Sequence, residues 1–172
     1  LSTWIQVAFD LHEVLFTRDR SASAWQAPLV AFEFIRHPTF WFSMKSHKSF
    51  EDAYNSRHDQ YDDKLESLKP RSINFANAQP PIKGMEELLS DLRQIGCVIY
   101  LFSNIGGIVL DDLKIKFPDI FVHFQVFHTP SQDNNYAKKP EPEAFRAFMD
   151  SYNSDGTRSV VFFDDKEKNI EE

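Results

Sequence analysis

The sequence has little of what marks a secreted or membrane-bound protein. Its 172 residues include one cysteine, Cys97, so no disulfide can form within the chain. This lone thiol fits a reducing compartment, and we expect a cytoplasmic protein in which Cys97 is a small buried apolar residue. No apolar run approaches the roughly 20 residues of a membrane-spanning helix, and the N-terminus lacks the basic and apolar regions of a signal peptide. Because the first residue is Leu1, we expect a processed chain or part of a longer one.

Positive charge is also in short supply. The chain has 19 Lys and Arg residues against 26 Asp and Glu residues, which gives a formal net charge of −7. This balance argues against broad electrostatic binding to nucleic acid or to an anionic membrane. We therefore expect neither as a partner, although a local basic pocket is compatible with the overall charge. The sequence carries no signature of an oligomeric state.

Apolar material for a packed core is present in quantity. Hydrophobic residues make up 42% of the chain and aromatic residues 15%, most of them among the 17 Phe. Four short segments rich in β-branched or aromatic residues are typical of buried strands. They are residues 5–9, 98–102, 124–127 and 160–163.

Helical patterns alternate with these strands. Residues 84–96 predict a helix whose apolar stripe consists of Met85, Leu88, Leu89, Leu92 and Ile95, and Gly96 would end it. Residues 140–152 predict a second helix with a stripe of Phe145, Phe148, Met149 and Tyr152, and residues 108–117 a weaker one that ends at Pro118. The alternation predicts an α/β fold, a Rossmann-like three-layer sandwich around a mainly parallel sheet.

Residues 17–79 interrupt this alternation. They show no strand signal, yet they contain Trp- and Phe-rich stretches that a linker would lack. We therefore predict an inserted helical module over 17–79, with residues 1–16 and 80–172 forming the core domain.

Polar side chains follow three of the predicted strands at the point where each strand ends. Asp10 follows the first strand, Ser103 and Asn104 follow the second, and Asp164 and Asp165 follow the fourth. In open α/β sheets the ligand crevice lies beyond the carboxyl ends of the strands. Carboxylates from two strands suit a hard cation such as Mg²⁺, which prefers oxygen ligands.

Two lysines precede the last helix. Lys138 or Lys139 could reach the crevice, neutralise the carboxylates and hold an anionic group. Taken singly, each of these polar residues is as well explained as a turn residue or a solvated charge. Their coincidence at three strand ends favours a site, and the Pro-Glu-Pro helix start favours Lys139.

The motifs FDLHEVLF, LFSN, KKPEPEAF and FFDDKEKN, in this order, resemble the four motifs of the haloacid dehalogenase superfamily. The resemblance extends from Val7 to Asn169. It is strongest to the phosphatase-like members of subfamily I, which carry a helical cap after the first motif. Residues 17–79 would be that cap.

The resemblance implies a role for each matching residue. Asp10 would be the nucleophile that forms an aspartyl-phosphate, and Ser103, Lys139 and the backbone of Asn104 would bind the phosphoryl group. The partner would be a small phosphorylated molecule.

The resemblance also implies a metal site. The cofactor would be Mg²⁺, bound by Asp10, by Asp165 and by the backbone carbonyl of His12. Asp164 would be a further ligand or a support for one. Asn169 would orient the loop that carries both aspartates.

Two residues depart from the family pattern. His12 stands where phosphatases of the family carry the Asp that protonates the leaving group, and Glu13 stands where Gly is common. Imidazole can also transfer a proton near neutral pH. The sequence therefore predicts a Mg²⁺-dependent phosphohydrolase. The alternatives are a catalytically impaired binding or regulatory protein, or a hydrolase of other specificity, such as a haloacid dehalogenase or a phosphotransferase.

Overall fold

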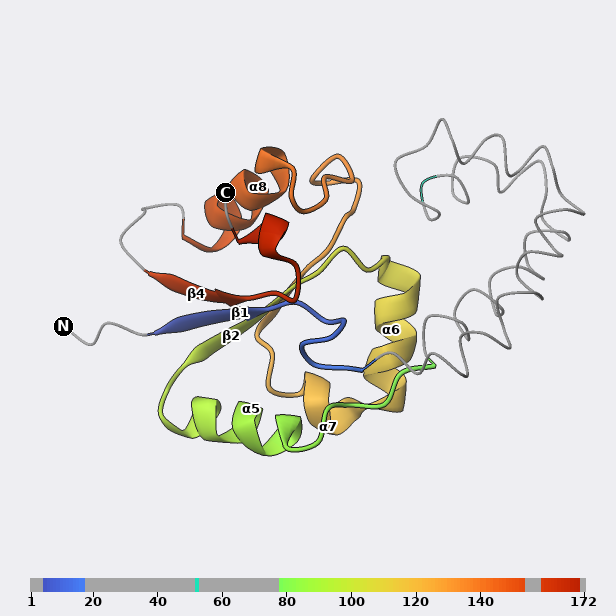
Figure 1. Cartoon of the computed structure of the whole chain (residues 1–172). Coiled ribbons are helices and arrows are strands. Elements are labelled where there is room, and N and C mark those ends of the chain that lie inside the picture. The colour runs from blue at the N-terminus through green and yellow to red at the C-terminus, as the bar shows by residue number, and fades with distance from the viewer. Residues whose placement is uncertain (1–4, 18–51, 53–77, 154–158, 171–172) are drawn as a thin grey trace, which may run out of the picture.

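Four parallel strands form the centre of the part of the chain that the structure describes, which is residues 5–17, 52, 78–153 and 159–170 in a computed structural model. The strands are β1 (Gln6–Phe9), β2 (Val98–Phe102), β3 (Val126–His128) and β4 (Val160–Phe163). Their order in the sheet is β3-β2-β1-β4, and all neighbours are parallel (Figure 1). Phe9 at the end of β1 is in register with Leu101 and Phe163, so the carboxyl ends of these three strands are nearly level.

Helices cover both faces of this sheet. α5 (Met85–Gln94), α6 (Gly107–Lys116) and the short α7 (Pro118–Phe121) lie on one side, and α8 (Pro142–Tyr152) lies on the other (Figure 1). A 3₁₀ turn, η1 (Glu167–Asn169), follows β4. The predicted three-layer α/β architecture is confirmed.

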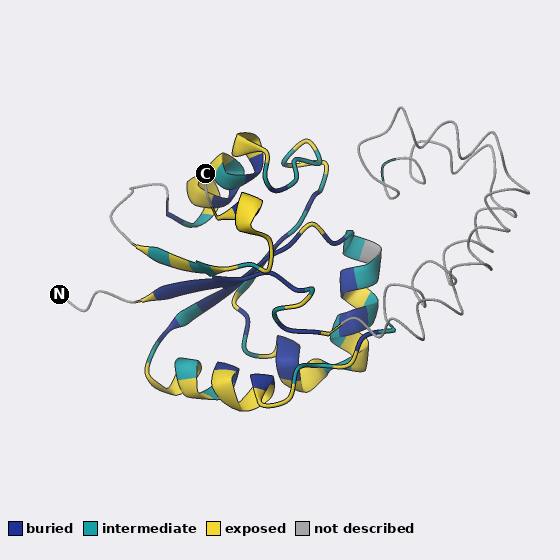
Figure 2. Ribbon diagram, in the orientation of Figure 1, coloured by how far each residue is buried: buried dark blue, intermediate teal, exposed yellow. Residues whose placement is uncertain are grey.

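The core is divided between the two faces by the alternation of side chains along each strand. Val7, Phe9 and Leu101 pack into one apolar cluster together with residues of α5, α6 and α7. Ala8 and Phe102 point the opposite way, into a smaller cluster with residues of α8. Successive side chains of a strand face opposite sides, so strands that are covered on both faces are mainly apolar; Gln6 of β1 and His128 of β3 are the buried polar exceptions among the described strands. Figure 2 accordingly shows β1 buried along its length.

The predicted helix stripes are wider than the faces that pack. On α5, Leu89 is fully buried but Leu88 is 44% exposed, and Ile95, the residue directly after the helix, is 74% exposed. Met149 of α8 is also exposed. Each helix meets the sheet along one narrow line, so residues at the margin of the stripe face solvent. Cys97 is buried, as expected.

Several boundaries differ from the sequence prediction by one or two residues, and two of the differences have a physical reason. β3 begins at Val126 rather than at residue 124, because Phe124 is buried in the turn that precedes the strand. Pro118 ends α6 as predicted, but it also starts α7, which the sequence analysis missed. Proline is favoured in the first turn of a helix, so one residue serves as both stop and start.

The chain leaves and re-enters the core at one place. Thr17 N donates to Pro80 O at 3.0 Å, Ile82 N donates to Leu15 O at 2.9 Å, and Phe16 and Pro81 form an antiparallel bridge. Apart from residues 17, 52, 78 and 79, the predicted helical module over 17–79 lies outside the described residues, so this domain division stays a prediction. No helix within the described ranges is long and apolar enough to cross a membrane.

The contrast between two neighbouring leucines of α5 gives a test of this packing. We expect Leu89→Ala to lower the free energy of unfolding by about 2–5 kcal/mol, because it removes a fully buried side chain from the main cluster. Leu88→Ala, one residue away and 44% exposed, should cost less than about 1 kcal/mol. Urea denaturation of both variants measures the difference. Equal losses would contradict the orientation of α5.

Candidate active site

Asp10 is fixed at the carboxyl end of β1. Its backbone N–H donates to Phe163 O at 2.8 Å, which extends the pairing of β1 with β4 by one residue. The residue is only 4% exposed, so its carboxylate is held at the buried floor of this edge. β1 ends at Phe9, so Asp10 is the first residue beyond the apolar run and lies at the edge of the sheet.

Lys139 binds two carboxylates at once. Its Nζ donates to Asp10 Oδ1 at 3.0 Å and to Asp164 Oδ2 at 2.6 Å, and its side chain is 1% exposed. A third hydrogen bond runs from Nζ to the carbonyl oxygen of Phe102 at 2.6 Å. The ammonium also lies 4.7 Å from the ring centroid of Phe162, a cation–π distance. A buried charge needs partners of this kind, because an uncompensated one costs several kcal/mol.

The backbone of Lys139 is held by Asn104. Lys139 N donates to Asn104 Oδ1, and Asn104 Nδ2 donates to Lys139 O, both at 2.8 Å. The residue that follows β2 thus fixes the loop that delivers the lysine. A substrate contact through the Asn104 backbone stays a prediction, and the sequence contains no sign of this side-chain role. No sequence signal links two residues 35 positions apart.

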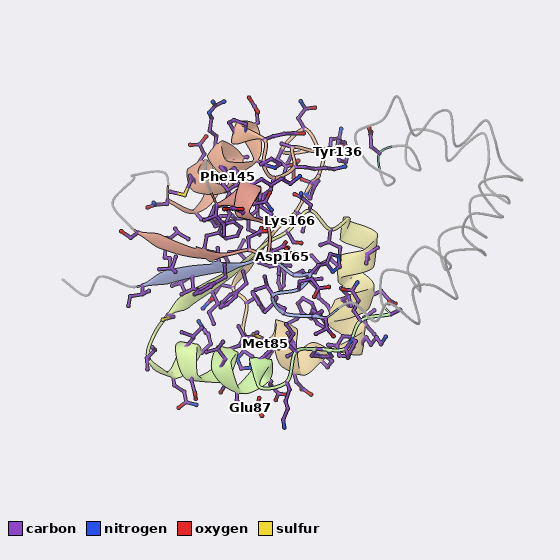
Figure 3. The ribbon with its side chains drawn as sticks, in the orientation of Figure 1. Met85, Glu87, Tyr136, Phe145, Asp165 and Lys166 are labelled. Carbon is purple, nitrogen blue, oxygen red and sulfur yellow. The ribbon has the colours of Figure 1, made fainter. Side chains whose placement is uncertain are left out.

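The loop after β4 is closed by its own hydrogen bonds. Asp164 Oδ1 accepts from Lys166 N at 2.9 Å and from Asn169 Nδ2 at 2.8 Å. Both oxygens of the Asp164 carboxylate are therefore engaged, one by this loop and one by Lys139. The next residue, Asp165, is exposed, and Figure 3 shows it with Lys166 beyond the end of β4.

Ser103 lies at the same edge, 2% exposed. Its backbone N–H donates to His128 O at 3.1 Å, at the end of β3. The His128 imidazole is enclosed by aromatic rings that include Phe148 and Tyr152. Burial lowers the pKa of His128, so this ring stays neutral and packs as part of the core.

The three aspartates form the one group of potential metal ligands found in the described part of the chain. One oxygen each of Asp10, Asp164 and Asp165 lies within 4.8 Å of the others. A set of carboxylate oxygens suits Mg²⁺ in preference to softer metals. The residues present therefore fit the predicted cation.

Comparison with known proteins agrees with this geometry. A family model described as a haloacid dehalogenase-like hydrolase matches residues 7–171. The chain belongs to this family. No match was found among curated proteins.

Solved structures of other family members share the fold of this hydrolase. A predicted HAD-like hydrolase from Porphyromonas gingivalis has 18% identity and a TM-score of 0.66, covering 99% of this chain and 86% of its own. A HAD family enzyme from Bacteroides thetaiotaomicron, crystallised with magnesium and inorganic phosphate, has 20% identity and a TM-score of 0.63, covering 98% and 88%. A predicted phosphatase from Clostridium acetobutylicum has 18% identity and a TM-score of 0.56, covering 98% and 79%.

The two residues that the sequence predicts to depart from the family pattern, His12 and Glu13, lie in the turn after β1 of this hydrolase. Glu13 has φ 59°, in the left-handed region, and its N–H donates to Phe16 O at 2.7 Å. This conformation favours glycine and costs another residue roughly 1 kcal/mol. The half-buried His12 lies with its Nδ1 2.7 Å from Gln79 Oε1. The sequence contains no sign of this contact, because no local pattern relates Gln79 to His12.

Replacing Lys139 tests the charge balance of the site. Lys139→Met would leave two buried carboxylates facing each other, and we expect a loss of about 3–5 kcal/mol in the free energy of unfolding at neutral pH. Lys83→Met, at an exposed lysine outside the site, is the matched control, with a change within about 0.5 kcal/mol. Chemical denaturation measures both. Similar losses for the two variants would show that the buried ammonium is not the specific requirement.

Proposed function

We propose that the protein is a Mg²⁺-dependent phosphohydrolase that acts on a small phosphorylated metabolite through an aspartyl-phosphate. The observation that carries this proposal is the Lys139 ammonium, which is shared by Asp10 and Asp164 beside Asp165. The cluster joins a candidate nucleophile, a fixed positive charge and an oxygen-rich cation site at one sheet edge.

In the first half of the reaction a carboxylate oxygen of Asp10 attacks phosphorus. The new O–P bond forms as the bond to the leaving oxygen breaks, and His12 gives that oxygen a proton. Lys139 holds Oδ1 of Asp10, so it fixes the orientation of the carboxylate and offsets negative charge on the transferring group. Ser103 and the backbone of Asn104 would bind the phosphoryl oxygens.

In the second half water attacks phosphorus and the bond between Asp10 and the phosphoryl group breaks. His12 now accepts a proton from the water, which returns the imidazole to its starting state. Inorganic phosphate leaves, and the Asp10 carboxylate is regenerated.

Asp10, Asp165 and the backbone carbonyl of His12 would hold Mg²⁺. Asp164 serves as support, because both of its oxygens already accept hydrogen bonds. When bound, the cation neutralises phosphoryl charge during transfer. The magnesium and phosphate in the Bacteroides thetaiotaomicron enzyme support this choice of cation and substrate class.

Asp10→Asn tests the nucleophile. It removes the attacking carboxylate while keeping the side-chain shape, so we expect Mg²⁺-dependent turnover of p-nitrophenyl phosphate to fall by roughly 10³-fold or more. Circular dichroism should show an unchanged fold. Asp150→Asn, an exposed site on α8, is the control and should retain full activity. Unchanged turnover in Asp10→Asn would refute the assignment, and halide release without a metal would favour a dehalogenase.

His12→Ala tests the proton donor. An alkyl phosphate needs its leaving oxygen protonated, whereas p-nitrophenolate leaves readily as an anion. We expect roughly a 10²–10⁴-fold loss with the alkyl ester and a much smaller loss with the aryl ester. Equal losses would argue against acid catalysis by His12. If the wild type turned over no ester of a broad panel and His12→Asp restored activity, the catalytically impaired alternative would hold.

A further inference from the structure

Gln79, the last residue of the predicted inserted module, contacts His12. It lies 67 residues after His12, its side chain is buried with 8% exposure, and its Oε1 is 2.7 Å from His12 Nδ1. This is a short hydrogen bond between an imidazole nitrogen and an amide oxygen. It joins the turn after β1 to the strand-like stretch by which the chain re-enters the core.

The chemistry of the two atoms fixes the direction of this bond. An amide oxygen carries lone pairs and no proton, so the imidazole must donate. A neutral imidazole has one N–H, and the partner of one ring nitrogen determines which nitrogen carries it. With Gln79 Oε1 as acceptor, His12 carries its proton on Nδ1.

The acceptor is itself held in place. Next to Gln79, Pro80 O accepts from Thr17 N, and Pro81 pairs with Phe16. Phe16 N in turn donates to Leu11 O at 3.0 Å, which ties this pairing to the turn that contains His12. The backbones that carry the imidazole and the amide thus belong to one hydrogen-bonded unit. The His12–Gln79 hydrogen bond therefore forms at a small cost in conformational entropy.

We infer that Gln79 is a positioning residue that keeps the His12 proton on Nδ1 and so assigns proton transfer to Nε2. The catalytic consequence rests on the proposed function. In both halves of that reaction the proton would be exchanged at Nε2: the doubly protonated ring gives it to the leaving oxygen, and the ring protonated only on Nδ1 takes it from water. The Nδ1 proton stays on the ring throughout and is donated to Gln79 Oε1. The same atom then serves the leaving group and the attacking water without rotation of the ring.

Nitrogen-15 NMR of the imidazole tests the tautomer independently of activity. The spectrum is recorded on the full chain at a pH about two units above the ordinary imidazole pKa of about 6.5, where the neutral ring dominates. His12→Asn identifies the His12 signals among the six histidines. We expect protonated Nδ1 and unprotonated Nε2 in the wild type. In Gln79→Leu we expect a shift toward the Nε2-protonated form, while Gln94→Leu, an exposed site on α5, should leave the signals unchanged.

Kinetics tests the catalytic consequence. Gln79→Leu should lower kcat for an alkyl phosphate by about 10–100-fold, with a much smaller effect on p-nitrophenyl phosphate. Gln79→Glu keeps an oxygen acceptor and should restore most of the alkyl phosphate turnover. A purely structural role for Gln79 would lower both substrates alike and would not be rescued by Glu.

The outcomes separate the two claims. Nε2-protonated His12 in the wild type would overturn the inference even if Gln79→Leu fails to fold, and so would an Nδ1-protonated ring that persists in Gln79→Leu. An Nδ1-protonated wild type that loses this form in Gln79→Leu, yet turns over no phosphate ester, would support the positioning role and reject the proposed function.

Discussion

The contact on which the site depends is the buried ammonium of Lys139 between two carboxylates. Asp10 and Asp164 are both nearly inaccessible to solvent, and they follow strands that are hydrogen-bonded to each other. Without a cation between them, two like charges would meet in a poorly solvated place. The Lys139 ammonium offsets the repulsion between these two carboxylates. With Asp165, the cluster holds three carboxylates and one ammonium, a formal net negative charge that suits a divalent cation.

The parallel sheet makes this meeting possible. The register of β1 with β2 and β4 brings three chain segments, each some 60 to 90 residues from the next, to one level edge. Each segment then delivers polar groups to this edge: a carboxylate after β1, a hydroxyl and an amide after β2, and two carboxylates after β4. The lysine comes from a loop instead, and Asn104 gives that loop a fixed backbone through two hydrogen bonds. The position of the Lys139 ammonium is thereby as well defined as that of a residue at a strand end.

The sequence could predict those parts of the fold and the site that depend on neighbouring residues, and it could not predict contacts between residues that are distant in the chain. Strands β2 and β4 were predicted with correct bounds, because their apolar runs end at polar residues. The polar residues at strand ends were found for the same reason, since a parallel sheet gathers its carboxyl ends. The Asn104–Lys139 and His12–Gln79 hydrogen bonds could not be found, because each joins residues distant in sequence whose types suit any loop. The exposed Leu88 was assigned to the core because periodicity gives the direction of a helix stripe but not its width.

The turn after β1 carries both residues that the sequence predicts to depart from the family pattern, and its hydrogen bonds relate them. Glu13 adopts a left-handed backbone that glycine would adopt more easily, and its N–H closes the turn on Phe16. The strain is therefore offset by hydrogen bonds of the turn, which also connect to the returning chain beside Gln79. A turn made rigid in this way can hold the imidazole ring in one orientation. The tautomer is a separate matter, because a partner on Nδ1 determines which ring nitrogen carries the proton. In the proposed mechanism His12 therefore needs an acceptor for its Nδ1 proton, and Gln79 Oε1 lies 2.7 Å from that nitrogen.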